Sequence, residues 1–164
     1  MSTRRTFVKG VALAGAGLLG SGTLARAQGL LAAAPALDPG DPEVPNEQVA
    51  KILKDLFGDR PIRRGQLSLD MPAVAEDGRI VPVIIESPLP IEPDNYVKAV
   101  HLIVDHNPDP HLAAYHLTPA IGSVAIQTRI KMKRTTWVRA ILETSTGDVW
   151  ANYAHVIVSL NGCG

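Results

Sequence analysis

Between residues 46 and 58 the apolar side chains recur with the spacing of an α-helix. They fall at positions i, i+3, i+4, i+7 and i+8 and so share one stripe of a helical surface: Val49, Ile52, Leu53, Leu56 and Phe57. Asn46 belongs to the residue types that cap helix N-termini, and Gly58 stands where a glycine commonly follows the last helical turn. The pattern predicts one amphipathic helix.

From Gly65 onward the pattern changes to short apolar runs separated by Pro, Gly, Asn and Asp. Several runs alternate with the two-residue period of a half-buried strand, so that Val100, Leu102 and Val104 share one face. The predicted strands are residues 66–70, 80–87, 97–105, 113–117, 124–132, 135–144 and 149–160. These seven runs predict an all-β fold: an immunoglobulin-like β-sandwich of about seven strands, preceded by one short N-terminal helix.

Individual residues indicate further features of the predicted strands. Residues 144–148, Thr-Ser-Thr-Gly-Asp, predict a hairpin turn between the last two strands. Pro82 has no backbone N–H, so it predicts that its strand lies at a sheet edge or contains a bulge. A sheet edge is a place where another chain can pair. Trp137 and Trp150 lie in predicted strands and are interpreted as core or interface anchors.

The N-terminus has the pattern of an export signal. The sequence Thr-Arg-Arg-Thr-Phe-Val-Lys resembles the twin-arginine consensus, with Arg4 and Arg5 as the paired arginines. The apolar stretch that follows, residues 10–22, is too short to span a bilayer, and the Ala-Arg-Ala before Gln28 matches a cleavage site. We expect export to the periplasm by the twin-arginine pathway, and a mature form without membrane attachment.

Four segments are expected: a signal peptide, residues 1–27; a loosely ordered lead, 28–45; the helix and β-sandwich, 46–160; and a flexible C-terminal carrier arm, 161–164. Cleavage removes four of the 16 Lys and Arg and none of the 16 Asp and Glu, which leaves a formal charge of −4. The remaining 137 residues fit one domain. No basic stripe or aromatic-basic interleaving remains, so no nucleic-acid partner is expected.

The chain has one cysteine, Cys163, which stands between Gly162 and Gly164 at the end of the sequence. An intramolecular disulfide is therefore excluded, and in an oxidising compartment an odd cysteine is either paired with another molecule or kept for its reactivity. Flanking glycines remove bulk and permit positive φ, so the arm of Asn161, Gly162 and Gly164 suits entry into a narrow channel. The pattern predicts a covalent attachment site, activated by partner enzymes because no Lys or Arg adjoins it.

Other chemistry is not indicated by the sequence. The five histidines are scattered: His101, His106, His111, His116 and His155. Two of them, His106 and His111, flank a loop that could bind a metal, but a solvated turn is favoured, and we expect no metal site and no cofactor. There is no Gly-rich phosphate loop and no nucleophile motif. We expect no catalytic residues, and therefore a carrier that acts with partner enzymes rather than an enzyme.

Seven short segments, taken in order, carry a resemblance to a known family. They are Ile-Glu-Ser-Pro (85–88), Val-Lys-Ala-Val-His-Leu (97–102), Asn-Pro-Asp-Pro (107–110), His-Leu-Thr-Pro (116–119), Thr-Arg-Ile-Lys (128–131), Gly-Asp-Val-Trp (147–150) and Asn-Gly-Cys-Gly (161–164). Together with the twin-arginine signal they resemble the SoxY family, over nearly all of the mature chain. The order of the segments and the C-terminal cysteine are more specific than any single strand fragment.

The resemblance implies a sulfur carrier of periplasmic thiosulfate oxidation that forms a heterodimer with a SoxZ-like subunit. Cys163 would tether thiosulfate-derived intermediates covalently. The resemblance implies three further partners of the Sox system: a c-type cytochrome enzyme that conjugates thiosulfate to the thiol, a hydrolase that releases sulfate, and a sulfane dehydrogenase. The usual family tail is Gly-Gly-Cys-Gly-Gly; here Asn161 replaces the first glycine, and no glycine follows Gly164.

Three classes of function stay open on the sequence. The sulfur carrier is favoured, either for thiosulfate or, as a divergent SoxY paralogue, for another sulfur compound. The second class is a non-catalytic β-sandwich, a binding or structural protein in which Cys163 is incidental. The third is a thiol-dependent enzyme such as a peroxidase or disulfide oxidoreductase, which is disfavoured because the chain has neither a resolving cysteine nor a C-x-x-C motif.

Overall fold

The computed structural model describes residues 40–160. In chain order the elements are α1 (Glu47–Phe57), β1 (Ile62–Arg64), β2 (Ser68–Asp70), β3 (Val74–Asp77), β4 (Val81–Ser87), β5 (Val97–Val104), β6 (His111–His116), the 3-10 helix η1 (Pro119–Ile121), β7 (Val124–Ile130), β8 (Thr136–Thr144) and β9 (Val149–Leu160). The predicted signal peptide and the predicted arm, with Cys163, lie outside the described residues.

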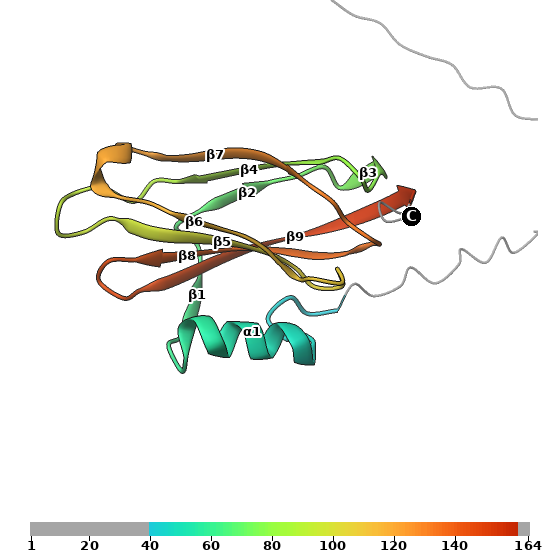
Figure 1. Ribbon diagram of the computed structural model, residues 1–164, viewed down its shortest axis with the longest axis horizontal. Helices are drawn as coiled ribbons and strands as arrows, with labels where there is room; N and C mark the ends of the chain where they lie inside the picture. Colours follow the sequence, from blue (N-terminus) through green and yellow to red (C-terminus); the bar gives the residue numbers. More distant parts are fainter. Residues whose placement is uncertain (1–39, 161–164) are drawn as a thin grey trace, which may run out of the picture. The chain divides into compact units, whose positions relative to one another are not determined.

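The strands form two sheets that pack face to face (Figure 1). The larger sheet has the order β1-β9-β8-β5-β6, and β3 pairs with β9 off this path; the smaller sheet has the order β2-β4-β7. Between the sheets lies an apolar core to which both contribute, with Val83 and Ile85 from β4, Leu102 from β5 and Leu142 from β8. The predicted β-sandwich preceded by one helix is confirmed.

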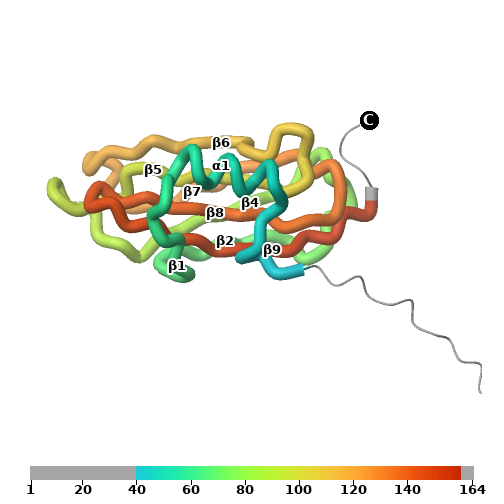
Figure 2. Tube along the Cα trace, turned by 90° about the horizontal axis from the view of Figure 1, so that it is seen from below, coloured from blue at the N-terminus to red at the C-terminus, as the bar shows by residue number. Residues whose placement is uncertain are grey.

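Helix α1 lies on the outer face of the larger sheet (Figure 2). At its start, Asn46 Oδ1 accepts a hydrogen bond from the backbone N–H of Val49 at 2.9 Å, as an N-cap does. Gly58 ends the helix with φ +63°, a conformation that favours glycine. The apolar stripe, including the buried Val49 and Phe57, packs against Ile103 and Ile141 of the sheet. The predicted helix and both of its caps are confirmed.

The helix buries the outer face of the two central strands β5 and β8. The sequence analysis interpreted β5 as half-buried, with only the face of Val100, Leu102 and Val104 in the core. In the structure the opposite face is buried as well: His101 is 5% exposed and Ile103 is 0% exposed. The prediction of a half-buried strand is therefore wrong, because one face packs on the smaller sheet and the other on α1.

All seven predicted strands are present, with ends that shift by two residues or fewer, but the structure has two more. The additional strands are β1 and β3, of three and four residues, and both pair with β9 in parallel. Segments this short contain too few positions to display a two-residue period, and their pairing with a distant strand is a long-range contact. The sequence therefore predicted the sandwich without these two strands.

Pro82 was predicted to mark an edge strand or a bulge, and the edge prediction is wrong. Its strand, β4, is the middle strand of the smaller sheet. The proline is tolerated because β2 is short: its pairing with β4 extends only from Ser68 opposite Glu86 to Asp70 opposite Ile84. Pro82 lies beyond that end and pairs only with β7, opposite Arg129.

Two further predictions are confirmed. The turn between β8 and β9 spans residues 145–148, with Gly147 at φ +94°. Trp150 packs against the sandwich core, and the guanidinium of Arg63 lies 4.1 Å from its ring centroid.

Among residues 40–160 there is no helix with the length and apolar character that crossing a membrane requires.

Candidate functional site

The structure fixes the strand from which the predicted carrier arm continues. β9 ends at Leu160, three residues before Cys163 in the sequence. Its last residues pair with β3, with Ile157 opposite Val74, and the backbone N–H of Val158 donates to Thr135 Oγ1 at 2.9 Å (Figure 1). The end of β9 is therefore bound on two sides before the chain reaches the cysteine.

The residues that the sequence analysis assigned to sites are Cys163, the arm residues Asn161, Gly162 and Gly164, and the export residues Arg4 and Arg5. All six lie outside residues 40–160, so their assignments stay predictions. The site can nevertheless be built from the surface that surrounds the end of β9.

Four cationic side chains lie close together in sequence at the end of β7 and in the link from β7 to β8: Arg129, Lys131, Lys133 and Arg134. All four are exposed, whereas Ile130 between them is 7% exposed and Met132 is 0% exposed. Strand-like alternation therefore places the apolar residues inward and Arg129, Lys131 and Lys133 outward. We refer to these four cations as the basic end. The sequence analysis, which found no basic stripe, missed them because apolar residues interrupt the run.

The basic end differs from the other cations of the domain in its lack of ion pairs. Of the twelve Lys and Arg in residues 40–160, seven form an ion pair with a carboxylate. Four of the five without one, within this part of the chain, are the cations of the basic end. An exposed cation without a partner is available to an anionic ligand.

The carboxylate that lies opposite the end of β9 does not neutralise the basic end. Asp77 pairs with Leu160 in the register of β3 and β9, and its side chain accepts from the guanidinium of Arg79 at 2.7 Å. This hydrogen bond lowers the pKa of Asp77 below its usual value. Asp77 is thus ionised and already paired with Arg79.

Two histidines that are ten residues apart come together beside α1. His101 Nδ1 lies 3.2 Å from His111 Nε2, and the ring of Phe57 packs edge-on against His101 with centroids 5.3 Å apart. Burial, followed by the charge of His111, lowers the pKa of His101 to about 4, so this ring is neutral at pH 7. Within residues 40–160 no three His, Cys, Asp or Glu side chains form a group that could bind a metal.

The helix-covered face of the larger sheet also contains a buried ion pair. Arg139, 1% exposed, donates to both carboxylate oxygens of Asp105 at 2.5 and 2.7 Å. A third bond runs from Arg139 to the carbonyl of Pro42, and Asn46 donates through Nδ2 to the carbonyl of Asp105 at 2.5 Å. These bonds connect residues 42–46, part of the lead and the helix cap, to the sheet.

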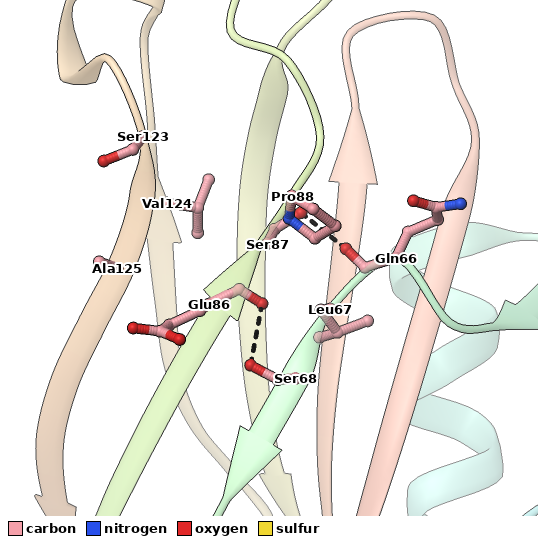
Figure 3. A pocket seen from close by; sticks show the side chains of 9 residues that line it. All are labelled: Gln66, Leu67, Ser68, Glu86, Ser87, Pro88, Ser123, Val124 and Ala125. Carbon is pink, nitrogen blue, oxygen red and sulfur yellow. Dashed lines mark hydrogen bonds between the residues drawn. The ribbon is translucent and has the colours of Figure 1, made fainter.

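A hollow of about 630 Å³ lies near the end of β4 that is remote from β3, and Figure 3 shows its lining. Ser87 donates to the carbonyl of Gln66 at 2.6 Å, and Ser68 donates weakly to the carbonyl of Glu86 at 3.5 Å. Glu86 is the carboxylate among the lining residues, and no histidine is among them. Because a nucleophilic serine needs an adjacent base, this lining does not form the arrangement of a hydrolase.

The fold and the site define a class of protein: a β-sandwich whose last strand, bound at one end of the domain, is followed within three residues by the chain's one cysteine. The family model described as "Sulfur oxidation protein SoxY" matches residues 53–163, which include Cys163. The chain therefore belongs to the SoxY family, and the resemblance inferred from the sequence is confirmed. No curated protein matches the chain.

Solved structures support the fold. The sulfur carrier protein SoxY from Chlorobium limicola f thiosulfatophilum aligns with a TM-score of 0.54 and 19% identity, over 68% of this chain and 96% of that one. A putative superoxide reductase from Thermotoga maritima aligns with a TM-score of 0.50 and 15% identity, over 59% and 93% of the two chains. At these identities the likeness establishes the shared sandwich and nothing about activity.

Proposed function

We propose that this protein is a carrier for sulfur intermediates, which it binds covalently through Cys163 and presents to the enzymes of sulfur oxidation. The observation that carries the proposal is the family match, which extends to residue 163, the position of the only cysteine. The chain geometry agrees with it. Cys163 is the third residue after Leu160, so the length of the chain keeps its Cα within about 10 Å of the end of β9.

The proposed attachment is an oxidation of the thiol together with thiosulfate. Cys163–SH and S₂O₃²⁻ give Cys163–S–S–SO₃⁻, one proton and two electrons, and a c-type cytochrome partner accepts the electrons. A hydrolase partner then adds water to the terminal sulfur, which yields Cys163–S–SH, sulfate and one proton. A sulfane dehydrogenase would oxidise the sulfur that stays on Cys163. The carrier itself supplies the nucleophilic sulfur atom and no acid, base or metal.

Intact mass spectrometry of the protein isolated from its own cell envelope tests the proposal. Cells supplied with thiosulfate are expected to yield protein with additions of sulfur or of an S₂O₃ unit on Cys163, and Cys163→Ser is expected to yield none. A Cys163 thiol without additions would support the structural or binding alternative. Oxygen additions alone would support a thiol peroxidase. An adduct derived from a different sulfur compound would identify a divergent paralogue.

We also propose that the protein reaches the periplasm through the twin-arginine pathway, on the basis of Arg4 and Arg5. Replacing both arginines with lysine is expected to leave the precursor in the cytoplasm, whereas the wild-type protein should be found in the periplasm with Gln28 at its N-terminus. Cell fractionation and N-terminal sequencing measure both outcomes. Normal export of the double variant would contradict the proposed pathway.

We propose a stable heterodimer with a SoxZ-like subunit, as the family membership suggests. Val74 and Ile157, which are 52% and 48% exposed, lie opposite each other where β3 pairs with β9. Adjacent exposed apolar side chains of this kind are suited to burial in an interface. We expect this pair to contact the partner subunit, next to the point where the chain continues to Cys163.

Co-expression with the SoxZ-like subunit tests this surface. Ile157→Glu is expected to weaken the complex at least tenfold, because the substitution places a charge in an apolar contact. Ile121→Glu is the matched control: Ile121 is 43% exposed but lies in η1, before the start of β7 and away from β3. Equal losses in both variants, or none in either, would show that Val74 and Ile157 do not form the interface.

A further inference from the structure

A second hollow, of about 320 Å³, is lined by the loop after β5 and the link from β7 to β8. Figure 1 shows this loop and this link at the end of the domain where β9 ends. Its lining residues are His106, Asn107, Pro108, Lys133 and Arg134. Two of these side chains, those of Lys133 and Arg134, are cations, and none is a carboxylate. We refer to it as the basic hollow.

Hydrogen bonds fix the two walls of the basic hollow against each other. Asn107 is 7% exposed; its Nδ2 donates to the carbonyl of Lys131 at 2.7 Å, and its Oδ1 accepts from the backbone N–H of Lys133 at 2.9 Å. His106 Nδ1 is hydrogen-bonded to Thr136 Oγ1 at 2.6 Å. One buried side chain thus joins the two segments, so the hollow exists before any ligand arrives.

The cations of the basic hollow form no ion pair within residues 40–160. Neither Lys133 nor Arg134 forms an ion pair there, although most cations of the domain do. The nearby carboxylate of Asp105 already binds Arg139 through both oxygens. Adjacent cations around a concave surface favour an anion with several acceptor oxygens, because Arg and Lys can each donate to a different oxygen.

The described part of β9 is joined to the link that lines the basic hollow. Thr135, the residue after Arg134, accepts the hydrogen bond from the N–H of Val158. Val158 precedes Cys163 by five residues, which span at most about 17 Å when extended. A group attached to the cysteine sulfur extends that reach further.

We propose that the basic hollow binds the sulfonate group at the outer end of the adduct on Cys163, with Lys133, Arg134 and His106 as donors to its three oxygens. This inference rests on the proposed carrier function. The sulfonate would occupy the hollow between visits to partner enzymes. Because the donors are exposed, the contact is weak enough to release the group to an enzyme.

The adduct can be made without any partner enzyme, which separates this test from a test of the carrier function. The Cys163 thiolate attacks tetrathionate, forms a bond to one of its inner sulfurs and displaces thiosulfate: Cys163–S⁻ and S₄O₆²⁻ give Cys163–S–S–SO₃⁻ and S₂O₃²⁻. The product is confirmed by its mass. Backbone amide NMR shifts are then compared between the thiol form and the adduct form of the same protein.

The expected result is a set of shifts at His106, Asn107, Lys133 and Arg134 in the adduct form. Lys133→Gln with Arg134→Gln should abolish them. Arg129→Gln with Lys131→Gln is the matched control, because it removes the same charge from the same segment but leaves the lining intact, and it should retain them. A second arm titrates inorganic sulfate into Cys163→Ser, which reports binding of a free oxyanion.

Each outcome decides the proposal. Shifts that occur with the adduct and need Lys133 and Arg134 support it. If inorganic sulfate produced shifts at the hollow and the adduct did not, the hollow would be a site for a free anion. That result would overturn the proposal. Absence of shifts at the hollow in the adduct form, or equal loss in both double variants, would also overturn it. None of these outcomes bears on whether cells load Cys163, which intact mass measures separately.

Discussion

The helix-covered face of the larger sheet and the basic end differ in how their charged side chains are paired. On the helix-covered face the buried Arg139 binds Asp105 through two hydrogen bonds, and Glu143 accepts from Arg60 at 2.7 Å and from Lys98 at 3.3 Å. At the basic end four exposed cations have no ion pair within residues 40–160. Buried charge must be paired to be tolerated, whereas exposed charge costs little when unpaired. The first region therefore stabilises the fold, and the second is available for binding.

The largest expected effect is on the helix-covered face. Arg139→Met leaves the carboxylate of Asp105 buried without its partner, and we expect a loss of about 3–5 kcal/mol in the free energy of unfolding. Urea titration followed by circular dichroism measures it. The variant is expected to have the same m-value as the wild type, since the surface exposed on unfolding is similar.

The double variant Asp105→Leu with Arg139→Met is the control for that prediction. It removes both charges, so it is expected to be more stable than Arg139→Met alone. A double variant that loses as much stability as the single one would mean that the cost comes from lost packing. The contrast between the two regions would then not rest on buried charge.

The second prediction concerns His101, on the same face. Its pKa is about 4 in the folded protein and about 6.5 in the unfolded chain, so the unfolded chain binds more protons between these values. The stability is therefore fully present above pH 6.5 and is lost as the pH falls toward 4, by at most about 3 kcal/mol. Urea titrations at several pH values measure this loss.

His101→Gln should remove most of the pH dependence between 6.5 and 4. His116→Gln should preserve it, because His116 is exposed. The carboxylate of Glu143 has a pKa below its usual value, so its own loss of stability on acidification falls at lower pH and does not mask the effect of His101. An unchanged pH profile in His101→Gln would contradict the assignment.

Asn46→Ala is expected to have a smaller effect on the same face. It removes the cap on Val49 and the bond to the carbonyl of Asp105, and we expect a loss of about 1–2 kcal/mol. Asn46→Ser can retain the cap but not the second bond, and should lie between the two proteins in thermal unfolding. If Asn46→Ser were no more stable than Asn46→Ala, the cap would contribute nothing.

The sequence predicted the fold best where one local pattern decides the structure. The helix from Asn46 to Gly58 has its apolar stripe and both caps within thirteen residues, so its prediction needed no tertiary information. The strands β1 and β3 were not predicted, because each depends on pairing with β9. That pairing is a long-range contact and leaves no periodic pattern in the local sequence. The prediction that Pro82 marks an edge strand was wrong for a related reason. Whether a second strand pairs with β4 at Pro82 depends on where β2 ends, which the sequence does not show.

The site was predicted less completely, and the reason is physical. Cys163 was singled out because a single cysteine is visible in the composition; the family match includes its position, and its role stays a prediction. The cations around residues 129–134 were missed because apolar residues interrupt the run, and charge alone would not have revealed whether their side chains form ion pairs. That depends on which carboxylates the fold brings near, as with Glu143, which binds Arg60 from 83 residues away. Only the three-dimensional arrangement shows that the basic end forms no ion pair within the part of the chain that the structure describes.

The smallest effect on stability is expected at the basic end, and salt separates the two regions. Lys133→Gln with Arg134→Gln should change the free energy of unfolding by less than about 0.5 kcal/mol, because exposed side chains without ion pairs contribute little to the fold. The NMR shifts that the adduct produces at the basic hollow should shrink as sodium chloride rises from low concentration to about 1 M, where the screening length falls to about 3 Å. The stability lost in Arg139→Met should hardly depend on salt over the same range, because the buried pair is screened much less. Urea titration and the amide spectra, recorded on the same samples at each salt concentration, measure both quantities. If the double variant were strongly destabilised, the basic end would be part of the structural framework, and the distinction between a region that stabilises the fold and a region that binds a ligand would be wrong.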